Sequence, residues 1–374
     1  MEVDLSLTKL DWIDQACDFV KRQLKLELPE GQTLKLIGQP STFFSGGLSI
    51  DPLIRLESRP GKRLLALIKK REISAERAAT YEQLFLPSCQ LLAQLPLCHS
   101  QLALPIATKL YLNGQKEAYL LMGLPPAAGF SWSHYLERVA ERQEGSLKRS
   151  QALTTAQEAS CAIARAVGEL HRIDFHWTKE VGSHQLEQER RRLNNFLSLM
   201  EQREALMPFR LEDFKEKFSA LFHQTLGLPA AVGYCHGDVR PTNLYYEAAT
   251  GQVTFIDGLT LFYAIEPHSG RGCGDTLSEW WQLSSSLQLF CHCLGLTAAE
   301  ELSLQQQLFS SYQKQNPLLS QQPAPLVKLS QLYQWMSHAH LLEGLPAESA
   351  FPQQSQGLSY CLRQIGELLQ LQRH

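Results

Sequence analysis

Apolar and polar residues follow two different patterns along this chain. Up to about residue 124, the apolar residues come in short runs separated by glycine and proline turns, which predicts strands. From about residue 125 onward, they recur every three or four positions over longer stretches, which predicts helices. We therefore expect a sheet-rich domain over 1–124 and a larger, mostly helical domain over 125–374.

The same patterns predict the individual elements. In the first part, an amphipathic helix is expected over 4–28 and a second helix over 74–86. The expected strands of this part cover 33–37, 53–57, 64–68 and 119–124. In the second part, helices are expected over 132–142, 154–171, 184–205 and 211–226, and over much of the Leu- and Gln-rich tail from 298 to 374.

One β-patterned pair of runs interrupts the helical part. The first run begins at Tyr245, a turn is expected at Gly251, and a second run returns over 253–256. Asn243 precedes this predicted hairpin and Asp257 follows it. The two side chains are therefore expected to converge at one end of the hairpin.

A conspicuous motif leads into this hairpin. The run His236-Gly237-Asp238-Val239-Arg240-Pro241-Thr242-Asn243 separates an acid from an amide by five positions. Phosphoryl transfer needs a carboxylate that meets the attacking hydroxyl, and oxygen ligands that hold Mg²⁺ against the phosphates. This spacing predicts Asp238 as the catalytic base, and Asn243 and Asp257 as the metal ligands.

These motifs resemble those of the aminoglycoside phosphotransferase and choline kinase group, which are small-molecule kinases. His236-Gly237-Asp238, Asn243 and Ile256-Asp257 match that group's motifs residue by residue. A predicted helix ending in Leu170-His171, and Gly274-Asp275 before another helix, are also similar to it. The resemblance is firm over roughly 160–282. It implies a protein-kinase-like, two-lobed α+β fold with a small sheet-rich N-lobe and a larger, mostly helical C-lobe.

The resemblance also implies nucleotide-binding residues in the N-lobe. Lys69 ends a run similar to the strand whose lysine pairs with nucleotide phosphates, and Lys70 is the alternative. Glu76 resembles the acid that pairs with this lysine, and Glu72 is the alternative.

Two backbone segments are expected to contact the nucleotide as well. Gly46 and Gly47 resemble a phosphate-covering turn between two strands. The backbone from Met122 to Leu124 would meet the adenine edge. Because Gly123 stands where the group often has an acid, ATP is the expected nucleotide and GTP remains the alternative.

The acceptor is expected between Asp238 and the helices over 184–226. Within 258–274, Tyr263, Glu266, His268 and Arg271 are expected to line its entrance. Arg271, Asp275 and the Glu279-Trp280 pair loosely echo a choline kinase pattern, in which an acid and aromatic rings bind a cationic amine. We therefore take Arg271, Glu266 and Glu279 as acceptor residues, although tryptophans on a helix more often belong to the core. His236 and Asp275 are expected to be structural, with Asp275 capping the next helix.

Composition agrees with a globular enzyme. The chain has 374 residues, of which 44% are hydrophobic and 20% charged. A net charge of −3 offers no general attraction for nucleic acid or an anionic membrane. No apolar stretch reaches the ~18 residues of a membrane span. The basic run Arg190-Arg191-Arg192 is expected on a solvated helix face.

The cysteines change little in this assignment. Nine cysteines, an odd number, and no secretory pattern at the N-terminus predict reduced thiols and a cytoplasmic location. Cys235 is expected to pack as a small buried group. Cys291, His292 and Cys293 lie on a predicted helix, where positions i and i+2 point to different faces, which disfavours a metal site.

Three functions remain open from the sequence. The first is a kinase that uses Mg²⁺ and ATP to phosphorylate a hydroxyl of an amino-alcohol, sugar or aminoglycoside-like acceptor. The second is a protein-directed kinase, and the third is a non-catalytic nucleotide-binding regulator. The presence of Asp238, Asn243 and Asp257 together argues against the third. The oligomeric state is left open.

Overall fold

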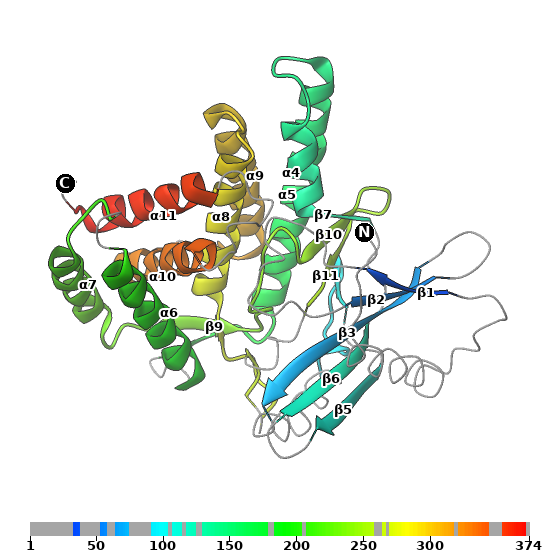
Figure 1. Cartoon of the computed structure of the whole chain (residues 1–374), viewed down its shortest axis with the longest axis horizontal. Coiled ribbons are helices and arrows are strands. Elements are labelled where there is room, and N and C mark those ends of the chain that lie inside the picture. The colour runs from blue at the N-terminus through cyan, green and yellow to red at the C-terminus, as the bar shows by residue number, and fades with distance from the viewer. Residues whose placement is uncertain are drawn as a thin grey trace. The chain divides into compact units, whose positions relative to one another are not determined.

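Figure 1 shows the computed structural model of the chain. With side chains, the structure describes residues 91–103, 129–178, 189–203, 207–257, 264–266, 269–317, 321–343 and 355–371. It describes the backbone alone for the strands within 33–37, 53–57, 64–74, 107–113 and 117–124, and for helix residues 183–188 and 354. The chain divides into two compact units, one of Met1–Gln94 with Leu102–Ala127, and one of Leu95–Gln101 with Ala128–His374.

The first unit contains a five-stranded antiparallel sheet (Figure 1). Its strands, in spatial order, are β1 (Thr33–Ile37), β2 (Leu53–Glu57), β3 (Leu64–Ser74), β6 (Glu117–Leu124) and β5 (Ala107–Asn113). The expected strands are confirmed, and β5 was missed by the sequence pattern. Its alternation is interrupted at Lys109, and it becomes a strand by pairing along its whole length with β6.

Strand β3 is longer than expected. It continues to Ser74, which pairs with Glu117 of β6, so the predicted helix start at Ser74 is wrong. Lys69 and Glu72 lie on this same strand, with Lys69 opposite Met122. Long pairing with β6 overrides the local polar character of this segment. The expected helix over 4–28 lies outside the described residues.

The second unit is built mainly of helices. Six of its helices carry the argument below: α4 (Trp132–Ala140), α5 (Leu147–Arg172), α6 (Ser183–Gln202), α8 (Thr276–Cys293), α9 (Ala298–Gln315) and α10 (Ala324–Glu343). Two more are α7 (Leu211–Thr225) and α11 (Gln354–Leu369). Helix α5 begins earlier than the expected residue 154 because Ser146 caps it, its side chain accepting a hydrogen bond from Arg149 N at 3.2 Å.

Two small sheets lie among these helices. One has the order β4 (Ser100–Leu102), β11 (Gln252–Phe255), β10 (Leu244–Glu247) and β7 (Phe130–Ser131). The other has the order β12 (Gly274–Asp275), β9 (Ala230–Gly233) and β8 (His176–Thr178). Strands β10 and β11 form the expected hairpin, with Leu244 opposite Phe255.

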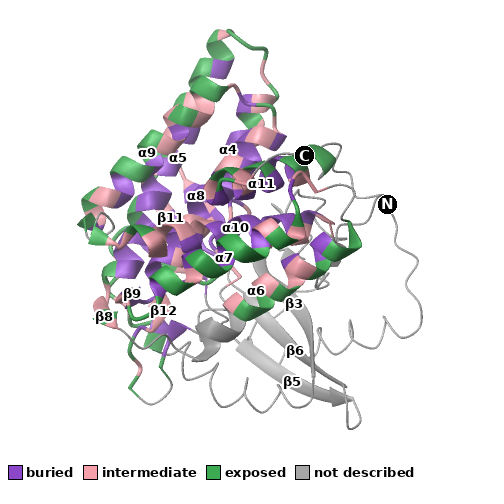
Figure 2. Ribbon diagram, turned by 90° about the vertical axis from the view of Figure 1, so that its left-hand side faces the viewer, coloured by how far each residue is buried: buried purple, intermediate pink, exposed green. Residues whose placement is uncertain are grey.

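Helix α8 lies in the core of the second unit. It packs against α9, α10 and α11, and most of its length is buried (Figure 2). Trp280, Leu283, Leu287 and Phe290 are all within 1% of complete burial. Among the described residues, no helix combines the length and the apolar character needed to cross a membrane.

Candidate active site

The hairpin of β10 and β11 brings the two predicted metal ligands to one end. Asn243 immediately precedes β10, and Asp257 follows β11 by one residue. The Ile256 backbone N–H donates to the Asn243 carbonyl at 2.9 Å, which continues the ladder past Leu244 and Phe255. Asp257 has a φ of +61°, a left-handed conformation that few residues other than glycine and asparagine adopt readily. A strained backbone at a candidate ligand is typical of a functional site.

Asp238 lies at the centre of a short hydrogen-bond network. Arg240 approaches it with two nitrogens, Nε at 2.5 Å from Oδ1 and Nη2 at 2.6 Å from Oδ2. Asn243 Nδ2 donates to Oδ2 of the same carboxylate at 2.9 Å and to the Asp238 carbonyl at 3.0 Å. Burial raises the pKa of Asp238, but the charge and hydrogen bonds of Arg240 outweigh it and hold that pKa below its usual value.

The same contacts orient Asn243. Its amide nitrogen must face Asp238, since only the nitrogen can donate to a carboxylate. The amide oxygen Oδ1 then points away, where the Thr242 hydroxyl approaches it at 3.4 Å. Asn243 Oδ1 and the Asp257 carboxylate are hard oxygen donors of the kind that Mg²⁺ prefers. The donor set therefore fits the metal that the motif predicts.

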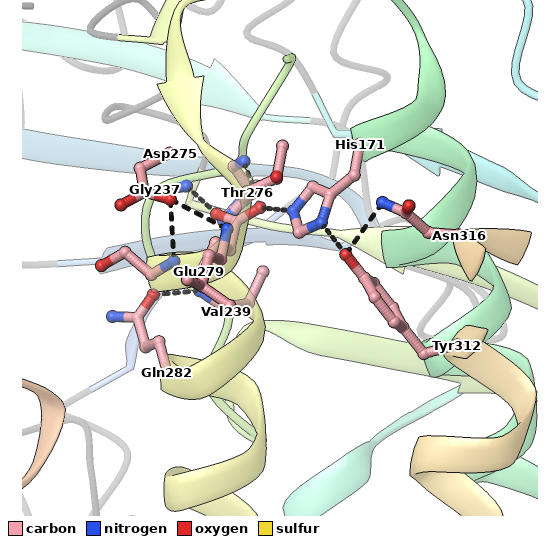
Figure 3. A network of polar contacts seen from close by, with 12 residues as sticks. His171, Gly237, Val239, Asp275, Thr276, Glu279, Gln282, Tyr312 and Asn316 are labelled. Atoms are coloured by element: carbon pink, nitrogen blue, oxygen red, sulfur yellow. Dashed lines mark hydrogen bonds and ion pairs between the residues drawn. The ribbon is translucent and has the colours of Figure 1, made fainter. Parts of the chain in front are cut away.

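Glu279, on the first turn of α8, holds the backbone of the catalytic loop (Figure 3). Its Oε2 accepts a hydrogen bond from His236 N at 3.0 Å, and its Oε1 accepts one from Gly237 N. One turn further along the helix, Gln282 Oε1 accepts from Val239 N at 3.2 Å. Backbone N–H groups on both sides of Asp238 thus donate to side chains of one helix.

A chain of buried polar side chains continues from Glu279 to two other helices (Figure 3). His171 Nε2 lies 2.7 Å from Glu279 Oε2, and His171 Nδ1 lies 2.7 Å from the Tyr312 hydroxyl. Asn316 Nδ2 donates to the same hydroxyl at 3.3 Å. Burial raises the pKa of Glu279, but its contact with His171 and the loop N–H groups lowers it below the usual value. The C-terminal ends of α5 and α9 are thereby tied to the loop through Glu279.

This placement favours a positioning role for Glu279 in place of the acceptor contact expected from the sequence. Its side chain is buried, and both of its oxygens are committed to the loop. Trp280 is also buried and stacks on Tyr312 at 4.1 Å between ring centroids, so it belongs to the core. The sequence could not separate these roles, since a helix face is assigned only by what packs on it.

The two residues expected to be structural are placed as follows. Asp275 is the N-cap of α8, and its Oδ1 accepts hydrogen bonds from Leu277 N at 2.9 Å and Ser278 N at 3.1 Å. The His236 ring is completely buried and lies against Phe255 of β11, with 5.6 Å between centroids. His236 therefore packs the loop onto the hairpin.

Arg271 and Glu266 lie on an exposed segment that is held by local contacts. Arg271 forms an ion pair with Asp174 at 3.3 Å, and the Glu266 carboxylate accepts a hydrogen bond from Ser269. The two residues face each other through backbone pairing, with Glu266 N donating to the Arg271 carbonyl at 2.8 Å. A role in acceptor binding stays a prediction for both.

Cys235 is buried, as the sequence predicts. Cys235, Cys291 and Cys293 are buried, and burial raises the pKa of each thiol. His292, which lies between Cys291 and Cys293 in the sequence, stacks on Tyr360 with 4.3 Å between ring centroids. Cys235 lies beside His171 and Glu279, but those two side chains already satisfy each other, so the group serves as a hydrogen-bond network.

The predicted nucleotide residues fall mainly outside the described side chains. Gly46, Gly47 and Glu76 lie outside the described residues, as do Tyr263 and His268. Lys69, with its neighbour Lys70, belongs to β3, and Met122 and Leu124 belong to β6; their backbones alone are described. Their nucleotide contacts stay predictions.

Two arginines were not among the predicted site residues. Arg240 lies two positions after Asp238, inside the motif, and its proximity to the base was the available signal. Arg192 was expected on a solvated face, but it is only partly exposed and faces α8, with Nη1 at 3.5 Å from Ser278 Oγ. Nothing in the sequence distinguishes it from Arg190 and Arg191.

Comparison with known proteins identifies the family. The model of the phosphotransferase enzyme family matches residues 68–257, just over half of the chain. No curated protein matches the chain. A solved glucosamine kinase aligns over 96% of this chain and 84% of its own, with 13% sequence identity and a TM-score of 0.50.

Two further solved structures align with lower scores. One is the amicoumacin kinase hAmiN in complex with AMP-PNP, Ca²⁺ and Ami, with 12% identity over 96% of both chains and a TM-score of 0.49. The other is the ADP-bound aminoglycoside phosphotransferase APH(2'')-Ib, with 10% identity over 95% of this chain and 98% of that chain, and a TM-score of 0.45.

The fold is the protein-kinase-like α+β fold, with a sheet-rich unit and a larger, mostly helical unit. The matched residues include most of β3, all of α5, the catalytic loop and the hairpin, so they carry the motifs from Lys69 to Asp257, whereas Gly274-Asp275 lies beyond them. The chain belongs to the phosphotransferase enzyme family and is a small-molecule phosphotransferase of the aminoglycoside phosphotransferase type.

Proposed function

We propose that this protein transfers the γ-phosphoryl group of ATP, with Mg²⁺, to a hydroxyl of a small-molecule acceptor. The observation that supports it best is the convergence of Asp238, Asn243 and Asp257 around one end of the β10–β11 hairpin. Phosphoryl transfer needs this combination of a base and two oxygen ligands, and little else of the protein in covalent terms.

The contacts support a role for each residue. Asp238 is the base that orients the acceptor hydroxyl and accepts its proton, and its lowered pKa keeps it ionised near neutral pH. Asn243 Oδ1 and Asp257 would hold Mg²⁺, which when bound would neutralise charge on the phosphates. Arg240 occupies both oxygens of Asp238 in this structure. Because each carboxylate oxygen has two lone pairs, Oδ1, which among the described residues accepts only from Arg240, can also accept a hydrogen bond from the acceptor hydroxyl.

The nucleotide site forms the second half of the proposal. Lys69 pairs with the phosphates and Glu76 orients that lysine, while the turn at Gly46 and Gly47 covers the phosphates. The backbone from Met122 to Leu124 binds the base. Residues 1–124 thus act as the nucleotide-covering domain and 125–374 as the domain for metal and acceptor. GTP is the alternative nucleotide.

The experiment is transfer of labelled γ-phosphate from ATP, and separately from GTP, into a deproteinised metabolite extract and into whole protein. Wild type is compared with Asp238→Asn, which keeps the side-chain shape and removes the base. We expect label in small molecules that falls at least about 100-fold in the variant. Label in protein alone would favour a protein-directed kinase, and nucleotide binding without transfer would favour a regulator.

A second variant separates metal binding from base catalysis. Asp257→Asn keeps a residue type that tolerates the left-handed backbone and removes one ligand charge. We expect it to weaken Mg²⁺-dependent nucleotide binding by about tenfold or more, whereas Asp238→Asn leaves that affinity nearly unchanged. Equal nucleotide affinity in both variants would contradict the assignment of Asp257.

A further inference from the structure

Arg192 is the one arginine of its basic run that turns inward. Arg190 and Arg191 are exposed, whereas Arg192 is partly buried on the side of α6 that faces α8 and α10. Its Nη1 lies 3.5 Å from Ser278 Oγ on the first turn of α8. Gln334 of α10 donates to the same hydroxyl at 2.9 Å. Arg192 therefore lies in a polar junction of three helices.

This junction adjoins the catalytic loop. Ser278 is the neighbour of Glu279, whose carboxylate holds His236 N and Gly237 N. Gln282, one turn along α8, holds Val239 N on the other side of Asp238. The negative charge of Asp238 itself acts on the Arg192 guanidinium. Helix α8 thus holds the backbone of the loop that contains Asp238, and the same helix provides the Ser278 hydroxyl that contacts Arg192.

Arg192 has far fewer partners than its side chain can use. A guanidinium carries five N–H donors, and here one of them makes a long hydrogen bond to a neutral hydroxyl. Among the described residues, no carboxylate forms an ion pair with Arg192. Burial lowers the pKa of this guanidinium, although the charges of Glu189 and Asp275 oppose that effect. A partly buried arginine without an acid partner is costly unless an anion binds to it.

Two of the three acids whose charges act on Arg192 make other contacts. Asp275 caps α8 through Leu277 N and Ser278 N, and Asp238 is held by Arg240 and Asn243. The pKa of His338 on α10 is influenced by two cationic side chains. Burial, Arg240 and Arg192 together lower the pKa of His338 to about 3, so it is neutral at physiological pH. The side chains around Ser278 thus include a cation, Arg192, and a neutral donor, Gln334.

We propose that the acceptor is a hydroxyl compound that also carries an anionic group, a carboxylate or a phosphate, which Arg192 binds while the hydroxyl faces Asp238. This inference rests on the proposed function and names its substrate class. The acceptor oxygen forms a bond to the γ-phosphorus, the bond from that phosphorus to the β-γ bridging oxygen breaks, and the hydroxyl proton passes to Asp238. An anionic acceptor takes the place of the cationic amine expected from the sequence, since Glu279 is buried and its carboxylate binds the loop.

The test separates a deproteinised metabolite extract by ion exchange into anionic, neutral and cationic fractions. Each fraction is incubated with labelled ATP and wild type, Asp238→Asn, Arg192→Gln or Arg191→Gln. Arg191→Gln is the matched control, because it removes an exposed charge from the same helix. Slow hydrolysis of ATP without any acceptor reports on the nucleotide site separately, and circular dichroism reports on folding.

We expect Asp238-dependent label in the anionic fraction, lowered about tenfold or more in Arg192→Gln and unchanged in Arg191→Gln. ATP hydrolysis without acceptor should be equal in both arginine variants. Mass spectrometry of the labelled product then tells a carboxylate from a phosphate.

Three results would overturn the inference and leave the proposed function intact. The first is Asp238-dependent label confined to the neutral or cationic fraction. The second is unchanged transfer in Arg192→Gln. The third is a loss of acceptor-free ATP hydrolysis in Arg192→Gln that equals its loss of transfer. The last would assign Arg192 to the nucleotide phosphates. If label in every fraction were independent of Asp238, the proposed function itself would fail, and the inference with it.

Discussion

Asp238 stays ionised in a partly buried position because its neighbours replace water that it has lost. Arg240 supplies charge and two hydrogen bonds, and Asn243 supplies a third. Without such partners, burial would raise the pKa of this carboxylate. The lowered pKa of Asp238 therefore depends on other residues of its own loop, chiefly Arg240.

Replacing Arg240 should move the pH dependence of the enzyme. In Arg240→Gln, burial acts on Asp238 without the opposing charge, so its pKa rises and more of it is protonated at a given pH. We expect the acid limb of the kcat/KM profile to shift upward by about one pH unit or more. Arg138→Gln, on the exposed side of α4, is the control. An acid limb at the wild-type position would show that Arg240 does not control the base.

At the scale of elements, α8 presents the loop to the active site, and α5 and α9 hold α8 in place. Glu279→Gln tests this arrangement. The new amide can accept only one of the two loop N–H groups, and its NH₂ group faces the other donor. We expect a loss of about 2–4 kcal/mol in the free energy of unfolding, measured by urea denaturation, together with a lower kcat. Wild-type stability and kcat would contradict the positioning role.

A second tie between elements joins α5 to α9. Arg149 Nε lies 2.7 Å from Glu300 Oε1, and Glu300 also completes a capping box with Thr297 at the start of α9. The hydrogen bond from Arg149 is the largest cause that lowers the pKa of Glu300, to about 2. A depressed folded-state pKa means that the contact stabilises the protein above the unfolded-state pKa, and that this stability is lost as pH falls through about 2.

Glu300→Gln should therefore destabilise the protein in a pH-dependent way. We expect a loss of about 1–3 kcal/mol near neutral pH, because Arg149 is left buried without its acid. The difference from wild type should shrink as the pH is lowered from about 4.5 toward 2. Thermal unfolding of both proteins across this pH range provides the measurement. A difference that stays constant with pH would rule out the ion pair as its source.

At the scale of the whole molecule, the helical unit depends on the apolar contacts of α8 with its neighbours. Leu287 is fully buried in this core, whereas Leu302 on α9 is 56% exposed. Leu287→Ala should lower the free energy of unfolding by about 3 kcal/mol through the lost contacts and the cavity left behind. Leu302→Ala should change it by less than about 0.5 kcal/mol. Urea unfolding followed by tryptophan fluorescence would compare them, and equal losses would contradict this account of the core.

Short-range features were predictable from the sequence. The catalytic loop and the hairpin lie within 22 consecutive positions from His236 to Asp257, so Asp238, Asn243 and Asp257 were assigned from spacing alone. The cap at Asp275 was also visible as a local signal. The start of α5 and the end of β3 were placed wrongly. The serine cap at Ser146 was overlooked, and β3 is extended by pairing with β6, which no local pattern reports.

The sequence by itself determined the reaction class and predicted the residues that we propose carry it, because those residues interact with neighbours a few positions away. Only the tertiary structure decided which helix residues serve them. Glu279 meets Gly237 across 42 positions, His171 meets Glu279 across 108, and Arg192 meets Ser278 across 86. Such contacts depend on how helices pack, and helical periodicity shows which faces are apolar without showing what lies opposite them. For that reason Glu279, which was expected to bind an amine, instead accepts hydrogen bonds from the loop. Arg192, which was expected in solvent, instead contacts Ser278 of α8.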